Sequence, residues 1–126
     1  ALAKTNVLIS FSPHLVPMTR GMLSTVYINL KQDMSSENLI EYFQNFYKDE
    51  PFVRILPLGE YANSHFTVSS NFCDIGVHVD KRNQRAIITS AIDNLIKGAS
   101  GQAVQNMNLM LGISETTGLN FPGIFP

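Results

Sequence analysis

The sequence predicts an α+β fold, in which a mainly antiparallel sheet carries helices on one face. Runs of β-branched and apolar residues alternate with turn-forming residues, and two of these runs flank the polar turn at 80–84 as hairpin strands do. Residues 37–47 instead repeat apolar side chains at helical spacing, and a second helical stretch lies near the end of the chain. The 126 residues are enough for one domain with a core of its own.

The first two strands are predicted at residues 6–12 and 22–30, because both runs are apolar and rich in β-branched residues. Pro13 and Pro17 interrupt the chain between them, since proline has no backbone donor for a ladder. Residues 22–30 carry apolar side chains on both faces. We therefore expect this second strand to be central and covered on both sides.

The helix that follows has a clear start and stop. Ser35 or Ser36 is a good N-cap, and Glu37 favours the positive end of the helix dipole. The pattern ends before Pro51, and its apolar members are Leu39, Ile40, Phe43, Phe46 and Tyr47. A groove for a cofactor or partner is conceivable for these aromatic residues, but packing against the sheet is the interpretation that we favour.

The remaining strands are short and alternate with turns. We expect them at residues 52–56, 72–79 and 85–92, with a possible return to strand at 66–68 after the loop 59–65. In the run 72–79, four residues face one way and indicate the buried side of the sheet: Cys73, Ile75, Val77 and Val79.

The stretch 93–112 opens with a glycine-containing turn and continues as a helix without charge between Lys97 and Glu115. A helix that faces water normally carries charges on its outer side. This helix offers amides instead, which can bond to another surface without burying a charge: Gln102, Gln105, Asn106 and Asn108. We therefore expect something outside this chain to cover it.

Composition excludes several classes of protein. A net charge of −1 and a pI near 6.3 argue against nucleic acid as a partner, and no apolar run reaches the roughly 20 residues that span a bilayer. The only cysteine, Cys73, excludes an internal disulfide and indicates a reducing, cytoplasmic location. The chain begins with Ala1, without an initiator methionine or a signal peptide, so we expect a piece of a longer protein.

Residue types alone indicate little chemistry. Cys73 and a histidine could form a nucleophilic pair, but a cysteine in the middle of an apolar strand is typically inert. The run 98–101 is glycine-rich at a helix start, yet it matches neither a P-loop nor a dinucleotide fingerprint. No metal-ligand spacing occurs, so we expect no metal site. His14 and Arg20 share a proline-stiffened loop that suits anion recognition, but from residue type alone we favour an ordinary surface role for both.

Several segments together closely resemble N-acetyl-gamma-glutamyl-phosphate reductases. The resemblance is carried by residues 12–21 (SPHLVPMTRG), 70–76 (SNFCDIG), 93–108 (DNLIKGASGQAVQNMN) and 118–126 (GLNFPGIFP). It extends over essentially the whole chain. It implies a glyceraldehyde-3-phosphate dehydrogenase-like C-terminal domain of an oxidoreductase that reduces N-acetylglutamyl phosphate with NADPH, to the semialdehyde, in arginine biosynthesis.

The resemblance also implies that the catalytic residues lie elsewhere. Family members carry an N-terminal NADP-binding domain with a glycine-rich fingerprint and a cysteine nucleophile, followed by a catalytic histidine. None of these motifs occurs in this chain, and Cys73 does not lie in the nucleophile's motif. We therefore expect no catalytic residue here and no activity of this chain alone.

Binding roles follow from the resemblance residue by residue. It makes His14 and Arg20 candidate ligands of substrate anions. Asn94 matches the asparagine that orients the nicotinamide in related dehydrogenases. Asp93, Lys97 and Gly98 are then expected to border the cofactor pocket.

The resemblance implies residues 1–126 to be one substrate-binding and dimerisation domain. Its terminal helix, about 93–112, is expected to dock on the N-terminal NADP-binding domain, in a homodimer or homotetramer that acts on a small molecule. A stand-alone interaction module that kept the fold and lost the chemistry is the alternative.

Overall fold

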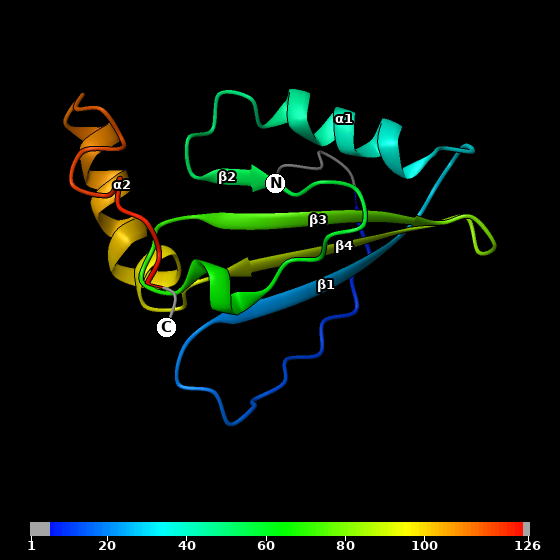
Figure 1. The fold of residues 1–126 in the computed structure, drawn as a ribbon, viewed down its shortest axis with the longest axis horizontal. Coiled ribbons are helices and arrows are strands. Elements are labelled where there is room, and N and C mark those ends of the chain that lie inside the picture. Colours follow the sequence, from blue (N-terminus) through cyan, green and yellow to red (C-terminus); the bar gives the residue numbers. More distant parts are fainter. Residues whose placement is uncertain (1–5, 125–126) are drawn as a thin grey trace.

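The computed structural model describes residues 6–124, which form a sheet, one helix along it and a second helical region at its end (Figure 1). The elements in chain order are β1 (Met22–Asn29), α1 (Ser36–Phe46), β2 (Val53–Ile55), the 3₁₀ turn η1 (Ser64–Thr67), β3 (Cys73–Asp80), β4 (Arg85–Ile92), the π-helical turn η2 (Ile96–Ser100) and α2 (Gly101–Met110). The α+β class is confirmed.

The 4-stranded sheet has the order β1-β4-β3-β2. Strand β4 pairs antiparallel with both β1 and β3, and β2 joins β3 in parallel. The predicted hairpin is therefore confirmed as β3–β4, and the sheet is mainly antiparallel with one parallel pair at its β2 edge. The two pairs are connected differently. A tight turn joins the antiparallel strands β3 and β4, whereas the parallel strands β2 and β3 need a longer crossover, which contains η1.

The core lies between α1 and the β3 side of the sheet. Its buried members are Leu39, Ile40, Ile75, Val77, Val79 and Ala86. Ser35 is the N-cap of α1, and its hydroxyl accepts a hydrogen bond from Asn38 N at 3.2 Å. Ser36 ties the same helix start to the sheet, because its hydroxyl accepts from Val79 N at 2.9 Å. The cap and most of the apolar stripe thus agree with the sequence-based expectation, but Phe46 is 67% exposed and lies outside the core.

Strand β1 is not central, and the expectation that it is covered on both sides is wrong. It forms one edge of the sheet, and all eight of its residues are exposed. Helix α1 lies over β2 and β3 and leaves β1 uncovered (Figure 1). Apolar residues on both faces of a strand therefore indicate here a surface without cover inside the described chain.

Two other predicted strands are also wrong. Residues 6–12 form no strand and lie exposed, because they pair with no neighbouring strand that would satisfy a ladder. Residues 66–68 fall in and after the 3₁₀ turn η1. Asn63 starts that turn, since its side chain accepts from His65 N at 3.0 Å, and the Thr67 hydroxyl bonds Ser64 O at 3.0 Å.

The turn followed by a helix that was expected over 93–112 is present, but the π-helical turn η2 lies between them and the α-helix is shorter than expected. Residues 93–95 form a turn, η2 follows, and the α-helix proper spans only Gly101–Met110. Helix α2 stands beyond the end of the sheet where β4 finishes, so of the two helices only α1 covers a sheet face (Figure 1). Two of the amides expected on its outer side point inward, since Gln105 and Asn108 are buried.

Candidate functional site

Two loops distant in sequence meet at one end of the sheet. Met22 and Ile92 are paired in the β1–β4 ladder, so the residues before β1 and after β4 are neighbours. There, Arg20 Nη2 donates to the Asp93 carboxylate, and Gly21 N donates to Asn94 Oδ1 at 2.8 Å. We call these four residues the loop junction. It brings together three residues that the family resemblance singles out, Arg20, Asp93 and Asn94.

Asp93 is the centre of the junction, with a side chain that is wholly buried. Its Oδ2 accepts from Arg20 and from Ser69 N at 2.6 Å, and its Oδ1 accepts from Leu95 N at 2.8 Å and Ile96 N at 2.9 Å. Burial by itself raises the pKa of Asp93, but the hydrogen bonds from Ser69, Ile96, Arg20 and Leu95 outweigh it and hold the pKa below its ordinary value. The carboxylate is therefore ionised and fully bonded at neutral pH.

The backbone around the junction is held in uncommon conformations. Ser69 has a φ of 60°, in the left-handed region that few residues other than glycine adopt, and this aims its N–H at Asp93. Gly21 has a φ of 98°, and a Cβ there would lie 2.6 Å from Ser64 Cβ. Position 21 therefore requires glycine for both conformation and space.

Arg20 retains bonding capacity after its contact with Asp93. A guanidinium has five N–H donors. The Arg20 side chain is 33% exposed, and its buried Nε has no acceptor among the described residues. The junction thus presents an oriented guanidinium with donors to spare.

Gly98 and Lys97 come just after the junction in sequence, and they contact different parts of the structure. Gly98 N donates to Asp93 O at 2.9 Å, which closes the turn that carries Asn94. Lys97 is directed toward α2, where its Nζ donates to Gln105 Oε1 at 2.7 Å and lies 5.4 Å from the centre of the Phe52 ring. Burial lowers the pKa of Lys97 against the opposing influence of Cys73 and two carboxylates. The Lys97 ammonium therefore supports α2 in this structure.

His14 lies outside the junction. It is exposed on the loop before β1, and its Nδ1 is 3.0 Å from the Ser12 carbonyl oxygen. No contact joins it to Arg20 or Asp93 among the residues that the structure places. Its proposed role as an anion ligand therefore depends on groups from outside this chain.

A buried polar network behind the junction was missed from the residue types. Asn71 Nδ2 donates to Gln105 Oε1 at 3.0 Å, and Gln105 Nε2 donates to Glu115 Oε2 at 2.7 Å. A Cβ on Gly101 would lie 2.4 Å from Asn71 Oδ1, so glycine is needed there for close packing. The segment SNFCDIG, quoted for the family resemblance, contains Asn71 and was the only signal for it.

Cys73 does not behave as a nucleophile. It is half-buried beside the core, and burial raises the pKa of its thiol, outweighing the opposite effect of Lys97. A raised pKa leaves little thiolate at neutral pH. In residues 6–124, no cluster of histidine, cysteine or carboxylate side chains is arranged to hold a metal ion.

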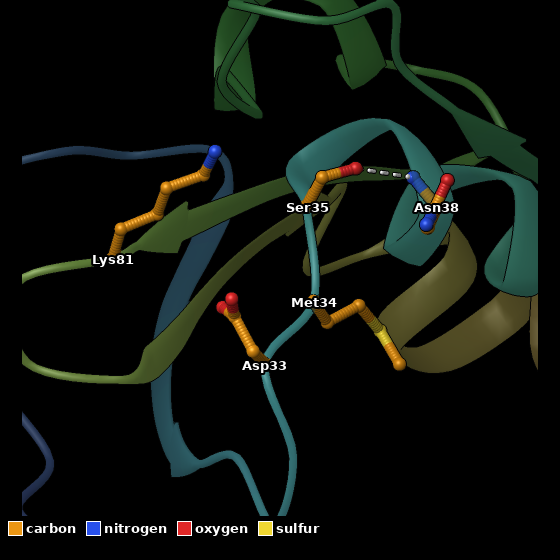
Figure 2. Close-up of a pocket in the computed structure, with 5 residues that line it drawn as sticks. All are labelled: Asp33, Met34, Ser35, Asn38 and Lys81. Carbon is orange, nitrogen blue, oxygen red and sulfur yellow. Dashed lines mark hydrogen bonds between the residues drawn. The ribbon is translucent and has the colours of Figure 1, made fainter.

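Two surface cavities lie at the other end of the sheet, about 25 Å away for strands of this length. One cavity, of ≈ 150 Å³, lies beside the start of α1. Its lining residues are drawn in Figure 2: Asp33, Met34, Ser35, Asn38 and Lys81. A second, of ≈ 670 Å³, lies by the β3–β4 turn and includes Glu37, Tyr61 and His78. Neither includes a residue of the junction, so the junction, with its buried charge and spare donors, remains the candidate site.

Comparison with known families decides the relationship of the chain. The family described as "Semialdehyde dehydrogenase, dimerisation domain" matches residues 1–94, which include β1 to β4 and the whole junction. The chain belongs to this family. The crystal structure of aspartate semialdehyde dehydrogenase II from Vibrio cholerae has the same fold, with a TM-score of 0.61 and 17% identity over 77% of this chain and 29% of that one.

Curated relatives are far closer in sequence. The N-acetyl-gamma-glutamyl-phosphate reductase of Staphylococcus saprophyticus is 53% identical over 99% of this chain, and that of Pelobacter propionicus is 54% identical over the same share. In both cases the match covers 36% of the relative. The chain thus spans about a third of the length of these proteins. For the stretch that the structure describes, no helix has the length and apolar character to cross a membrane.

Proposed function

We propose that this chain is the C-terminal part of an N-acetyl-gamma-glutamyl-phosphate reductase, an enzyme of arginine biosynthesis in the cytoplasm. The observation that carries the proposal is the 53% identity, extending over 99% of the chain, to a reductase of that name. The complete enzyme would reduce N-acetylglutamyl phosphate to N-acetylglutamate semialdehyde. NADPH would supply the hydride, and the cysteine nucleophile and catalytic histidine would come from outside this chain.

Arg20 is the residue that we assign to substrate binding. Asp93 orients its guanidinium, while the partial exposure of the Arg20 side chain leaves N–H donors for an incoming anion. Charge-assisted hydrogen bonds of this kind suit the phosphate or carboxylate of the substrate. His14 would approach the same anion only when the rest of the enzyme repositions its loop.

Asn94 is the residue that we assign to the cofactor, with Gly98 closing the turn behind it. Its amide stands beside Arg20 at the end of the sheet, so substrate and nicotinamide would meet at the loop junction. Asp93 is buried beneath this pocket and accepts a hydrogen bond from the backbone of the turn that carries Asn94. Lys97 lies at the border of the pocket, where it bonds Gln105 of α2.

The exposed apolar surfaces correspond to two interfaces in this proposal. Strand β1 would be covered by a second copy, which agrees with the family's description as a dimerisation domain. The end of α2 would dock on the N-terminal NADP-binding domain, since five apolar residues there are exposed: Met107, Leu109, Met110, Leu111 and Ile113.

The test is the activity of the full reading frame. We expect the complete protein to reduce N-acetylglutamyl phosphate with NADPH, and this chain alone to be inactive. In the complete protein, Arg20→Ala should raise the KM for the acyl phosphate far more than the dissociation constant of NADPH. Arg54→Ala is the matched control, because Arg54 makes a similar ion pair with Asp74 away from the junction. Activity of the chain alone, or equal effects of the two variants, would contradict the proposal.

A non-catalytic dimerisation module of the same fold is the second candidate, favoured by the exposure of the whole of β1. The upstream sequence separates the two. A glycine-rich fingerprint and a cysteine nucleophile upstream support the enzyme, whereas an unrelated domain there supports the module.

A further inference from the structure

Asn94 can present only one polarity to a ligand, because the structure fixes the orientation of its side-chain amide. Its Oδ1 accepts from Gly21 N at 2.8 Å. A backbone N–H can only donate, so the amide oxygen must face Gly21 and the amide nitrogen must face away. Within residues 6–124, that nitrogen has no acceptor. Asn94 therefore offers a ligand a hydrogen-bond donor.

Asp93 cannot itself contact a ligand. Its side chain has no exposed surface, and its two oxygens already accept four hydrogen bonds, which matches the lone-pair sites of a carboxylate. Any contribution of Asp93 to binding must therefore pass through the groups that it holds.

Those groups are the two that would face ligands. Asp93 accepts a hydrogen bond from Arg20, and its neighbour Asn94 accepts one from Gly21, the neighbour of Arg20. These two hydrogen bonds join the dipeptide Arg20–Gly21 to the dipeptide Asp93–Asn94, 73 residues later in the sequence. Together with the covalent bonds inside each dipeptide they form a closed ring. In such a ring a displacement of the Arg20 guanidinium strains the hydrogen bond that holds the Asn94 amide.

We propose that Asp93 is a positioning residue that makes the Arg20 guanidinium and the Asn94 amide move as one unit, so that a ligand bound at either group orders the other. This inference rests on the proposed function, in which Arg20 faces the acyl phosphate and Asn94 Nδ2 donates to the carboxamide oxygen of the nicotinamide. Anion and cofactor then bind with positive coupling, each tightening the other by the same factor.

Asp93→Asn in the full-length enzyme tests the coupling. The substitution keeps the shape but replaces one acceptor by a donor that faces Ser69 N or Arg20. In the wild type we expect saturating inorganic phosphate to tighten NADPH binding about tenfold, within the usual range of coupling between sites. In Asp93→Asn this factor should fall to one, and kcat should fall on the order of 100-fold, as misplaced catalytic geometry does.

Asp74→Asn is the matched control, because Asp74 is also buried and holds Arg54 through bonds of 2.6 and 2.9 Å. It should lower the melting temperature as Asp93→Asn does, yet leave the coupling factor unchanged. If both variants reduce the coupling equally, or neither does, Asp93 has only a structural role and the inference is overturned.

A second measurement on the wild type covers the case in which Asp93→Asn does not fold. Inorganic phosphate alone should slow hydrogen exchange of the Gly21 amide, because Gly21 N bonds Asn94, and Asn94→Ala should abolish this protection. Unchanged exchange on adding phosphate would overturn the coupling. A wild-type enzyme that neither binds NADPH nor reduces the acyl phosphate would instead refute the proposed function, which is a distinguishable outcome.

Discussion

Strands β1 and β3 lie on either side of β4, have eight residues each and are similarly apolar, yet their surroundings differ completely. Most of β3 is buried, because α1 packs on one of its faces and the segment before η1 approaches the other, where a Cβ on Gly76 would lie 2.8 Å from Glu60 O. Every residue of β1 is exposed. The comparison teaches that apolar strand sequence predicts burial without saying which molecule provides the cover.

The largest expected effect compares the same residue type on the two strands. Ile75→Ala, in the core of β3, should lower the free energy of unfolding of this chain by about 2–5 kcal/mol through the lost contacts and the cavity. Ile28→Ala, on β1 with 46% exposure, should change it by less than about 0.5 kcal/mol. Urea denaturation of both variants at concentrations where the chain is monomeric measures the difference. Equal losses would show that β1 is covered within one copy.

A charge on β1 should act on association instead of folding. Val26→Lys is expected to weaken self-association by about 2 kcal/mol, because the charge would be buried at the centre of a symmetric interface. Sedimentation at several concentrations measures it. Tyr42→Lys, on the exposed side of α1 at 62% exposure, is the control that should leave association unchanged. An undisturbed dimer in Val26→Lys would place the interface elsewhere.

The smallest effect concerns pH at the junction that anchors β1 to β4. The pKa of Asp93 is below its ordinary value of 3.8 in the folded chain, so its ionised form stabilises the fold. This contribution is complete above pH 3.8 and is lost as the pH falls through the lower, folded-state pKa. The stability difference between the wild type and Asp93→Asn should therefore shrink in acid. A difference that is constant down to pH 3 would contradict the role of the charge.

Local signals were sufficient for several elements. The cap at Ser35 and the apolar stripe placed α1 within a residue or two, and alternation together with the polar turn placed β3 and β4. These features succeed because helix caps and tight turns are determined by neighbouring residues. Apolar and β-branched content failed to predict the structure of residues 6–12, because a strand needs a partner and the described chain offers none.

The candidate site shows the same division. The family resemblance named Arg20, Asp93 and Asn94 as site residues, and the structure brings them together. It also directs Lys97 to Gln105 and leaves His14 on an exposed loop. The direction of each side chain depends on which loop lies opposite, and no local pattern contains that information.

The sequence by itself determined the class of fold, the α1 helix, the β3–β4 hairpin and the relationship to the family, because all of these depend on short-range patterns or on matching segments. Only the tertiary structure decided that β1 is an edge, that Gln105 and Asn108 face inward, and that Asp93 joins Arg20. The physical reason is the same in each case. A buried carboxylate, an inward amide and a strand edge are defined by partners distant along the chain, and only folding brings those partners within hydrogen-bond distance.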